Sequence, residues 1–594
     1  GLMGSAFVDV EPVKNLIFQS KVGVQFYPYA FRYFIDTIPQ NEFSATYNSF
    51  TEGSGYSTNL RWTNKVSYLT TIGAHRLSAF VAYEASKNNS RNIQSTVTNL
   101  LYTTPGYLNL SNGSIDPTQP SAGGSSISTT LSVFGNINYD YQNKYLFSFV
   151  ARRDGSSKFG PLHRYGNFFS YSGGWRMTEE KFMEELTWLD DFKLRAAYGE
   201  NGNNAIPDHL YEDTYTTNPS YSGGFNYSSY DLGGTNNTAL TGAGIYQLGN
   251  PYIHWETNRT TNLGFDASFF RNRLTVSFSW FNRITDDLLA IVPITGLRGD
   301  ALSPYVNSMK FVNKGLELEL GYTNKAGQVG YNMNFNISTY RNKVLYTDDF
   351  ETPIYSGKWG TSNWKLNKSM VGMPVSSFFG YEQEGIFKSK EEYTQNGVKH
   401  AGLTEDNAAG HFKFKDQDDS KEIDDDDRVF IGNPHPKFTA GYNLELSYRN
   451  LDMGLFFQGV YGNKIFNYWR AFTVFPGMQV KGADDTWSPD NPDAQLPVWD
   501  NVSSISQDVA PSSFFIEDGS YLRLKSLQIG YTFPSNKAFN KLRVYIQGYN
   551  LLTFTKYSGV DPEITTGNVT TYGIDFGGNY PVTRKIVFGL NIGL

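Results

Sequence analysis

The chain has 594 residues and a formal net charge of −7, and it lacks cysteine, which excludes disulfide bonds and cysteine-ligated metal centres. Hydrophobic residues make up only 39%, yet aromatic residues reach 16%, with 41 Tyr, 44 Phe and 57 Gly. The sequence has no run of about 18 apolar residues, which excludes a transmembrane helix, and the acidic balance argues against a nucleic-acid partner. Many Tyr, Phe and Gly with few aliphatic residues, and a mean hydropathy of −0.42, are typical of transmembrane β-barrels.

The first part of the chain predicts pairs of strands separated by polar segments. Strand patterns begin within Gly4–Phe34, where apolar residues alternate with polar or small ones. Leu60–Thr71 and Leu77–Ala85 form a second predicted pair. Ser86–Ser125 is rich in Asn, Ser, Thr and Gly and has no period, so we expect a loop there.

The next segments mix strand and turn signals. Leu131–Tyr139 and Tyr145–Ala151 predict another pair, and Arg152–Pro161, with Asp154-Gly155 at its centre, predicts a tight turn. The apolar residues of Glu179–Leu189 have helical spacing. A Gly-, Asn-, Ser- and Tyr-rich segment then runs to about Pro251.

The second half contains the clearest alternation. The apolar residues of Lys437–Gly462 fall at every second position, and the polar break Arg449-Asn450 divides them into two strands. Three further hairpins follow the same pattern: 263–269 with 274–280, 316–322 with 331–337, and 522–533 with 542–551. We expect the apolar face of these strands to contact lipid and the polar face to contact water.

The connections alternate between short and long, as they do in outer-membrane barrels. The short ones are 271–273, 324–328, 449–450 and 535–541, whereas the long ones are 200–251, 343–375 and 463–515. We expect the short turns on the periplasmic side and the long loops on the extracellular side. A soluble β-sandwich would need more Val, Ile and Leu, and a β-propeller would show a repeat of about 40–50 residues, which the sequence lacks.

Several segments resemble the SusC/RagA-like TonB-dependent outer-membrane transporters of Bacteroidetes. The similar blocks run in order from about residue 130 to the end: RRDGSSKFGPLHRYGNFFSYSGGWRMTEEKF, NPYIHWETNRTTNLGF, VNKGLELEL, RVFIGNPHPKF, DTWSPDNPDAQ, SYLRLKSLQIGYTFP and LRVYIQGYNLLTFTKYSGVDPE. The resemblance implies an all-β, transmembrane antiparallel β-barrel of about 22 strands with long extracellular loops, of which this chain shows patterns for roughly 18–20. It also implies import of oligosaccharides or peptides, driven by the TonB complex, with a SusD-like surface lipoprotein over the loops.

The domain organisation departs from the resemblance at the N-terminus. We expect residues 1–594 to form one outer-membrane β-barrel domain, without the plug and TonB-binding segment that such transporters carry before the barrel. The predicted location is the bacterial outer membrane. The rival hypothesis is a scaffold barrel that assembles with surface partners and transports nothing.

No catalytic motif is found, and the seven His are scattered, so we expect neither an enzyme nor a cofactor for chemistry. The sharpest candidate site is the acidic loop, DQDDSKEIDDDD, at residues 416–427. Six of its residues occupy positions 1, 3, 5, 7, 9 and 12 of a Ca²⁺-binding loop: Asp416, Asp418, Ser420, Glu422, Asp424 and Asp427. Lys421 stands where such a loop has glycine, so a solvated acidic loop remains the alternative.

Aromatic residues in the predicted loops are candidates for substrate binding, because aromatic faces stack on sugar rings. They are Trp359, Trp364, Tyr468 and Trp469, followed by Trp487 and Trp499. The alternative is that these residues anchor loops or lie at the membrane interface.

Overall fold

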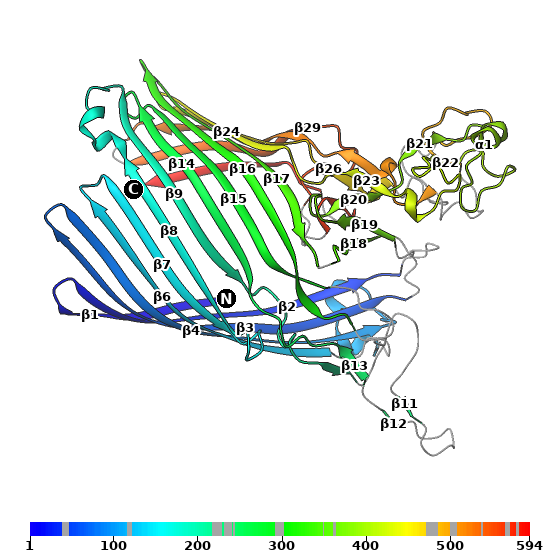
Figure 1. Cartoon of the computed structure of the whole chain (residues 1–594), viewed down its shortest axis with the longest axis horizontal. Coiled ribbons are helices and arrows are strands. Elements are labelled where there is room, and N and C mark those ends of the chain that lie inside the picture. The colour runs from blue at the N-terminus through cyan, green and yellow to red at the C-terminus, as the bar shows by residue number, and fades with distance from the viewer. Residues whose placement is uncertain are drawn as a thin grey trace. The chain divides into compact units, whose positions relative to one another are not determined.

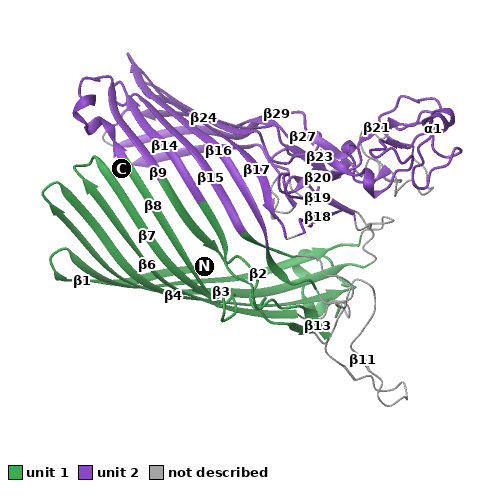
Figure 2. Cartoon of the chain, viewed as in Figure 1, with its two compact units in different colours: residues 1–174, 197–259, 287–307 green, residues 175–196, 260–286, 308–594 purple. Residues whose placement is uncertain are grey.

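The computed structural model of the chain divides into two compact units, which Figure 2 colours green and purple. Unit 1 comprises residues 1–174, 197–259 and 287–307, and unit 2 comprises residues 175–196, 260–286 and 308–594. The structure describes residues 1–37, 47–115, 122–216, 229–230, 240–241, 244–291, 302–348, 350–359, 364–470, 485–498, 508–535, 539–564, 571–577 and 581–593.

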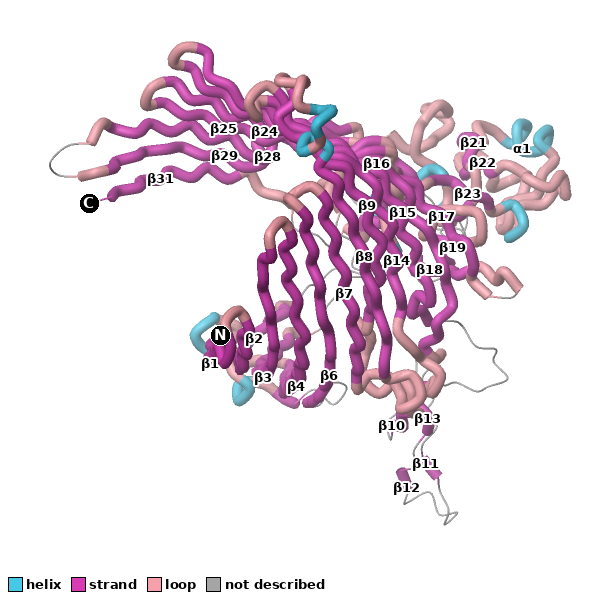
Figure 3. The backbone as a smooth tube through the Cα atoms, turned by 60° about the vertical axis from the view of Figure 1, so that its left-hand side comes forward, coloured by secondary structure: helices cyan, strands magenta, loops and turns pink. Residues whose placement is uncertain are grey.

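Unit 1 is built on an antiparallel ladder in the order β1–β2–β3–β4–β6–β7, and the short β5 pairs with the end of β4. Figure 1 shows the first of these long strands in blue, and Figure 3 shows them lying side by side. Their bounds are β1 Leu2–Val13, β2 Leu16–Ile35, β3 Ser49–Ile72, β4 His75–Thr98, β5 Ser114–Ile115, β6 Ala122–Tyr141 and β7 Tyr145–Ser156. Small two-stranded pieces join β10 Thr214–Thr216 to β13 Gly244–Gln247 and β11 Ser229–Tyr230 to β12 Leu240–Thr241.

Unit 2 is built on a second antiparallel ladder, in the order β16–β17–β24–β25–β28–β29–β31. The bounds are β16 Tyr305–Ala326, β17 Val329–Tyr346, β24 Phe438–Tyr448, β25 Leu451–Tyr461, β28 Tyr521–Phe533, β29 Lys541–Thr555 and β31 Lys585–Gly593. Four more strands, like β16, contribute residues to both units: β8 Tyr165–Arg176, β9 Leu189–Asn203, β14 Glu256–Phe269 and β15 Leu274–Ile291. Eighteen strands in the described residues belong to one sheet, within the roughly 18–20 expected from the sequence.

The predicted hairpins are confirmed, and their register explains the alternation of the sequence. Leu444 of β24 lies opposite Leu455 of β25, whereas the next residue, Glu445, lies opposite Gly454. Because neighbouring side chains on a strand point to opposite faces, each ladder has one apolar and one polar face. Tight turns close the hairpins, and two of them place a glycine in the left-handed region, Gly73 at φ 58° and Gly327 at φ 60°.

Two sequence-based expectations in unit 1 are wrong. Ser86–Ser125 is not one loop, because β4 continues through Thr98 and β6 begins at Ala122. Arg152–Pro161 is not a tight turn, since β7 continues through Ser156, and Ser156 pairs with Thr130 of β6. Both segments are polar on the two faces, so the alternation disappears, but the backbone hydrogen bonds of the ladder do not require it.

Helices are few and short in the described part of the chain. The segment Glu179–Leu189, with helical spacing, forms only 3-10 turns, η4 Met177–Glu179 and η5 Lys181–Met183. The α-helix α1, Lys390–Asn396, begins after Ser389, whose side chain accepts the Glu392 N–H, and ends at the left-handed Gly397. None of the described helices has the length and apolar character that spanning a membrane requires.

The connections of unit 1 form small hydrophobic cores of their own. The larger core joins the segment after β7 to the segments on either side of β13, and it contains Phe159, Phe168, Ile206, Leu210, Ile253 and Trp255. A smaller core of Phe50, Val97 and Leu100 lies at the long-loop ends of β3 and β4. These connections are therefore packed onto the strand ends and held in place by burial of apolar side chains.

Candidate functional site

The long connections of unit 2 fold into a body of their own, here called the loop assembly (residues 354–359, 364–432, 464–470, 485–498, 508–518 and 571–577). Figure 1 labels most of its small strands, which form separate sheets. One sheet contains β18 Ile354–Trp359, β19 Trp364–Ser369, β20 Ser377–Gly380 and β23 Val429–Gly432. The others join β26 Lys464–Asn467 to β27 Ile516–Asp518 and β30 Ile574–Asp575, and β21 Gln383–Ile386 to β22 Phe412–Phe414.

A hydrophobic core connects these segments, which lie far apart in the sequence. Its members are Leu366, Phe378, Tyr381, Phe412, Phe414, Ile423, Phe466, Leu496, Val509, Ala510, Phe514, Phe515 and Ile574. Phe378, Phe412, Phe466 and Phe515 are fully buried, and burial of one such side chain contributes about 1.5–3 kcal/mol. The predicted loops of unit 2 therefore hold one another in a defined arrangement.

A polar cavity of about 660 Å³ opens within the loop assembly. Its lining combines amide, carboxylate and cationic side chains with a few apolar ones: Gln383, Glu384, Gly385, Ile386, Lys388, Arg470, Pro492, Asp493, Ala494, Gln495, Ser513, Phe514 and Ile516. Lys388 forms an ion pair with Asp493, and the Gln383 N–H donates to Ser513 Oγ at 2.9 Å. A cavity with this lining suits a ligand that is rich in hydroxyl, amide or carbonyl groups.

Arg470 is the main fixed cation of this cavity. It belongs to the 3-10 turn η8 Tyr468–Arg470. Its guanidinium lies 3.9 Å from the ring centre of Phe514, and its Nη1 donates to the Phe514 carbonyl at 2.8 Å. Burial lowers the pKa of Arg470 from its ordinary value, while the nearby Glu517 opposes this shift. The aromatic ring and the carbonyl fix the orientation of the guanidinium.

The structure places two of the four predicted substrate-binding aromatics against the core. Trp364 and Tyr468 are partly buried and pack against the core of the loop assembly, and the Tyr468 ring lies 5.9 Å from that of Phe576. The backbone of Trp359 pairs with that of Trp364. The side chains of Trp359 and Trp469, and residue Trp499, lie outside what the structure describes. The packing of Trp364 and Tyr468 matches a role in anchoring loops.

In the acidic loop, the structure brings together three of the six predicted ligands. Asp416, Asp418 and Asp427 have carboxylate oxygens within 4.8 Å of one another. Asp427 is fully buried, and its two oxygens accept the backbone N–H groups of Gln417 and Asp424 at 2.6 and 2.8 Å. One oxygen of Asp416, Oδ1, is buried and has no hydrogen-bond partner in the structure. Three converging carboxylates with an unpaired oxygen fit a hard divalent cation.

The other three predicted ligands have different contacts. Ser420 donates its hydroxyl to the Glu422 carbonyl, and the Glu422 side chain pairs with Lys399 Nζ at 2.7 Å. Asp424 accepts the Asp426 N–H as the cap of the 3-10 turn η7 Asp425–Asp427. Hydrogen bonds from the Ser420 backbone and side chain are the main reason that the pKa of Asp418 lies below its ordinary value. That carboxylate is therefore ionised, as a cation ligand must be.

The polar face of the unit 2 strands carries hydrogen-bonded networks. Arg195 of β9 donates to Asn262 at 3.1 Å and to Ser279 at 2.6 Å, and it pairs with Asp266, which also binds Lys193. On the opposite face, the ring of Phe265 lies 5.7 Å from that of Phe278. The polar and apolar residues of these strands therefore separate onto two faces, as the sequence predicts.

The cavity-lining residues Gln383, Lys388 and Arg470 carry no signal that marks them as a site in the sequence. Gln383 and Lys388 lie in and just after β21, whereas Arg470 belongs to a distant segment, so no local spacing relates the arginine to the other two. The available signal is that Arg470 directly follows Tyr468 and Trp469, whose rings make them candidates for substrate binding. The cation of this three-residue turn, rather than its first ring, lines the cavity.

Comparison with known families gives a match over most of the chain. The model of a family described as TonB dependent receptor-like, beta-barrel, matches residues 14–551. The TonB-dependent receptor P3 of Formosa agariphila is 33% identical over 552 residues, which cover 90% of this chain and 52% of that protein. The TonB-dependent receptor SusC of Bacteroides thetaiotaomicron is 26% identical over 478 residues, which cover 78% of this chain and 44% of that protein.

Among solved structures, that of the RagAB peptide transporter has a TM-score of 0.78 and 22% identity, and it covers 99% of this chain and 61% of that one. The similarity in fold therefore extends over nearly the whole chain. The chain spans about half the length of the curated relatives it matches, 52% of one and 44% of another.

Proposed function

Since this chain belongs to the family of TonB-dependent receptor-like β-barrels, we propose that it imports oligosaccharides or peptides across the bacterial outer membrane together with a SusD-like surface lipoprotein. The chain is a SusC/RagA-like outer-membrane protein, and its fold class is the all-β, transmembrane antiparallel barrel. Residues 1–594 are proposed to form one barrel domain, with energy supplied by the TonB complex and no covalent chemistry in the chain itself.

The observation that carries this proposal is the polar cavity in a folded loop assembly. The long connections of unit 2 share a hydrophobic core that includes Phe378, Phe466 and Phe515. Connections without stable structure would not form such a core. The cavity presents Gln383, Gln495 and Arg470, whose donors can bind sugar hydroxyls or peptide carbonyls. Binding at this cavity would therefore select the substrate before transport.

A supporting element of the proposal is a structural Ca²⁺ ion held by Asp416, Asp418 and Asp427. The acidic loop follows β22, which pairs with β21, and β21 contributes Gln383–Ile386 to the cavity. Glu382 strengthens this link, because it accepts a hydrogen bond from Gln417 at 3.0 Å and pairs with Lys415 at 3.3 Å. Neutralising the acidic loop with a cation would fix the strand that lines the cavity.

An uptake assay with the full-length protein tests the proposal. Cells that carry or lack the gene are given fluorescent oligosaccharides and oligopeptides that are too large for porins, with a small porin-permeant sugar as control. We expect uptake of one class to require the gene and to stop when the proton-motive force is dissipated. Arg470→Ala should lower that uptake by about tenfold, the effect of losing about 1.4 kcal/mol of binding.

The scaffold hypothesis predicts a different result from the same cells. A scaffold barrel would assemble with surface partners, yet deletion of its gene would leave the uptake of both substrate classes unchanged. Uptake that persists after dissipation of the proton-motive force would also contradict the transport proposal.

A further inference from the structure

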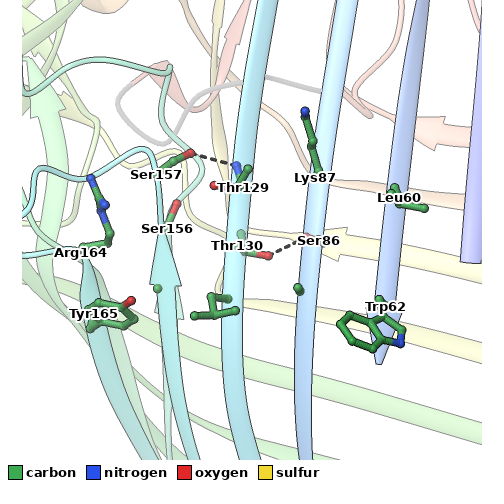
Figure 4. Close-up of a pocket in the computed structure, with 13 residues that line it drawn as sticks. Leu60, Trp62, Ser86, Lys87, Thr129, Thr130, Ser156, Ser157, Arg164 and Tyr165 are labelled. Carbon is green, nitrogen blue, oxygen red and sulfur yellow. Dashed lines mark hydrogen bonds between the residues drawn. The ribbon is translucent and has the colours of Figure 1, made fainter. Parts of the chain in front are cut away.

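Unit 1 has a groove of about 470 Å³ on the face of its strands that carries exposed apolar side chains. Figure 4 shows Trp62 and Tyr165 on its two sides, with Lys87 and Arg164 farther along the strands. The lining comes from five strands and the segment after β7: Leu60, Trp62, Ala85, Ser86, Lys87, Thr129, Thr130, Leu131, Gly155, Ser156, Ser157, Arg164 and Tyr165. All of these residues belong to unit 1.

The groove lies at one level along all of these strands. Trp62 is about ten residues from the turn end of β3, and Ala85, Leu131, Gly155 and Tyr165 are about equally far from the turn ends of their own strands. A tilted strand crosses the hydrocarbon core of a membrane in about 9–11 residues. The groove is therefore at the boundary of the bilayer on the side away from the short turns.

The surfaces on either side of this level differ in character. Toward the short turns, the same face exposes apolar side chains, among them Val66, Tyr68, Val81, Val133 and Phe147. Away from the turns, the same face of β4 continues with Lys87, Asn89 and Arg91. The change from apolar to polar residues within a few positions marks the interface between lipid tails and water.

Small residues leave space between the two aromatic side chains. Gly155 lies under the Tyr165 ring, and a Cβ atom there would come within 2.5 Å of Tyr165 Cε1. Ala85 and Leu131 lie opposite each other between Trp62 and Gly155. The result is an apolar depression between the two rings, which suits a segment of a hydrocarbon chain.

The polar end of the groove is positively charged. Lys87 and Arg164 line it. Arg153 lies on the same face of β7 but nearer the short turn than Gly155, and its guanidinium lies 5.0 Å from the ring centre of Tyr165. Arg164 Nε is buried and has no hydrogen-bond partner in the structure. No carboxylate belongs to the groove lining among the described residues.

The nearest acidic residues in these strands point to the opposite face. Glu84 accepts a hydrogen bond from Thr63 at 2.9 Å, and Asp154 pairs with Arg152 at 2.7 Å. The register places Glu84 and Asp154 next to Ala85 and Gly155, so their side chains alternate away from the groove. The cations are therefore available to an anion that approaches from the lipid side.

We propose that this groove binds a phosphate-bearing membrane lipid of the outer leaflet. One acyl chain lies over Ala85 and Gly155, between Trp62 and Tyr165, and the phosphate contacts Lys87 and Arg164. Guanidinium and ammonium groups at the membrane surface favour anionic lipid headgroups, and Trp and Tyr favour the interface. The site shares no residue with the loop assembly, and the proposal does not depend on which substrate is transported.

Native mass spectrometry of the delipidated full-length protein in detergent tests this site. The probes are dioleoyl phosphatidic acid, dioleoylglycerol, which has the same chains without phosphate, and inorganic phosphate as a competitor. We expect one tightly held phosphatidic acid, weaker binding of dioleoylglycerol, and no competition by phosphate. Replacing Lys87 and Arg164 with Ala should weaken binding about fivefold for each charge removed.

Two further variants separate loss of the site from loss of folding. Ala85→Trp fills the groove without a change of charge and should abolish tight binding, whereas Arg91→Ala removes a cation from the same face of β4 outside the groove and should bind normally. Resistance to trypsin and to unfolding in detergent should be unchanged in all variants. Equal binding by the double variant and the unaltered protein, equal binding of dioleoylglycerol, or displacement by phosphate would each overturn the proposal.

Discussion

Single side chains on the strands determine which face of the sheet meets lipid. On β24, Leu444 lies between Met333 of β17 and Leu455 of β25, so it is part of a continuous apolar row. The adjacent Glu445 lies on the other face, where it accepts a hydrogen bond from Asn332 at 3.2 Å. A difference of one position along the chain therefore separates a lipid-facing residue from a water-facing one.

This separation predicts opposite outcomes for two adjacent substitutions. Leu444 is about five residues from the turn after β24, close to the middle of a strand crossing, so Leu444→Arg should lower the free energy of unfolding by about 2–4 kcal/mol. The measurement is equilibrium unfolding of the purified protein in urea and lipid vesicles.

The neighbouring position supplies the control for this experiment. Glu445→Gln keeps an acceptor for Asn332, and it should change the free energy of unfolding by less than about 0.5 kcal/mol. Equal costs for the two substitutions would contradict the assignment of faces.

At the scale of elements, the loop assembly behaves as a small folded unit with its own polar contacts. His400 is fully buried there, and its Nε2 accepts the Phe414 N–H at 3.0 Å, while its Nδ1 lies 3.1 Å from the Val398 carbonyl. The acidic loop is tied to the same region through the buried Ile423. Because of His400 and the acidic loop, we expect the stability of the loop assembly to depend on pH and on the concentration of Ca²⁺.

The first condition is pH. Burial lowers the pKa of His400 below its ordinary value of 6.5, so the folded assembly holds a neutral imidazole while an unfolded one binds a proton near that value. The assembly should therefore lose stability as the pH falls below about 6.5, because the unfolded state binds more protons. Protease sensitivity of the assembly from pH 8 to pH 5 measures this loss.

A matched substitution distinguishes His400 from the other groups that titrate in this range. His400→Gln should weaken the dependence on pH, whereas substitution of the exposed His75 at the start of β4 should leave it unchanged. A protease sensitivity that does not vary with pH in the unaltered protein would contradict the prediction.

The second condition is the concentration of Ca²⁺. If Asp416, Asp418 and Asp427 bind the ion, Ca²⁺ at one hundred times its dissociation constant should stabilise the assembly by about 2.7 kcal/mol. Calorimetry and trypsin cleavage at Lys421, with and without a chelator, measure binding and protection.

Removal of two ligands should abolish both effects of Ca²⁺. Asp416→Asn with Asp418→Asn should do so, while Asp419→Asn with Asp426→Asn, an equal change of charge outside the cluster, should not. Absence of Ca²⁺ binding by the unaltered protein would leave a solvated acidic loop as the correct interpretation.

In each unit of the molecule, the long connections form a larger and more structured surface than the short turns do. In unit 1 they pack around Phe159 and Trp255, and in unit 2 they form the loop assembly with its polar cavity. The short turns present only a few residues, such as Gly73-Ala74 between β3 and β4. A surface partner would therefore find its binding area on the long connections.

This difference predicts the composition of the purified complex. Extraction of the tagged full-length protein from native membranes in mild detergent should recover a SusD-like lipoprotein in near-equal amount. Shortening the loop assembly by deleting residues 390–410 should reduce this recovery, while the barrel should still be inserted. Recovery of the barrel alone from unaltered cells would contradict the partner proposal.

The strand pairs, their two faces and the family resemblance could all be predicted from the amino-acid sequence. A period of two follows from the covalent geometry of an extended chain, so it can be read wherever one face meets lipid and the other meets water. Near the turns of β16, β17, β24 and β25 this condition holds, and the predicted hairpins there match the structure.

Where both faces of a segment are polar or the sequence has no period, the conformation became clear only from contacts in the folded chain. Residues 86–98 remain in β4 because their backbone forms hydrogen bonds with β3 and β6. These bonds stabilise a strand whatever side chains it carries. The spacing of residues 416–427 predicts six ligands for one ion, whereas the folded loop brings only three carboxylates together among the described residues. Trp364 and Tyr468 pack against a core contributed by distant segments. Contacts between residues far apart in the chain leave no local pattern, which is why sequence alone could not reveal them.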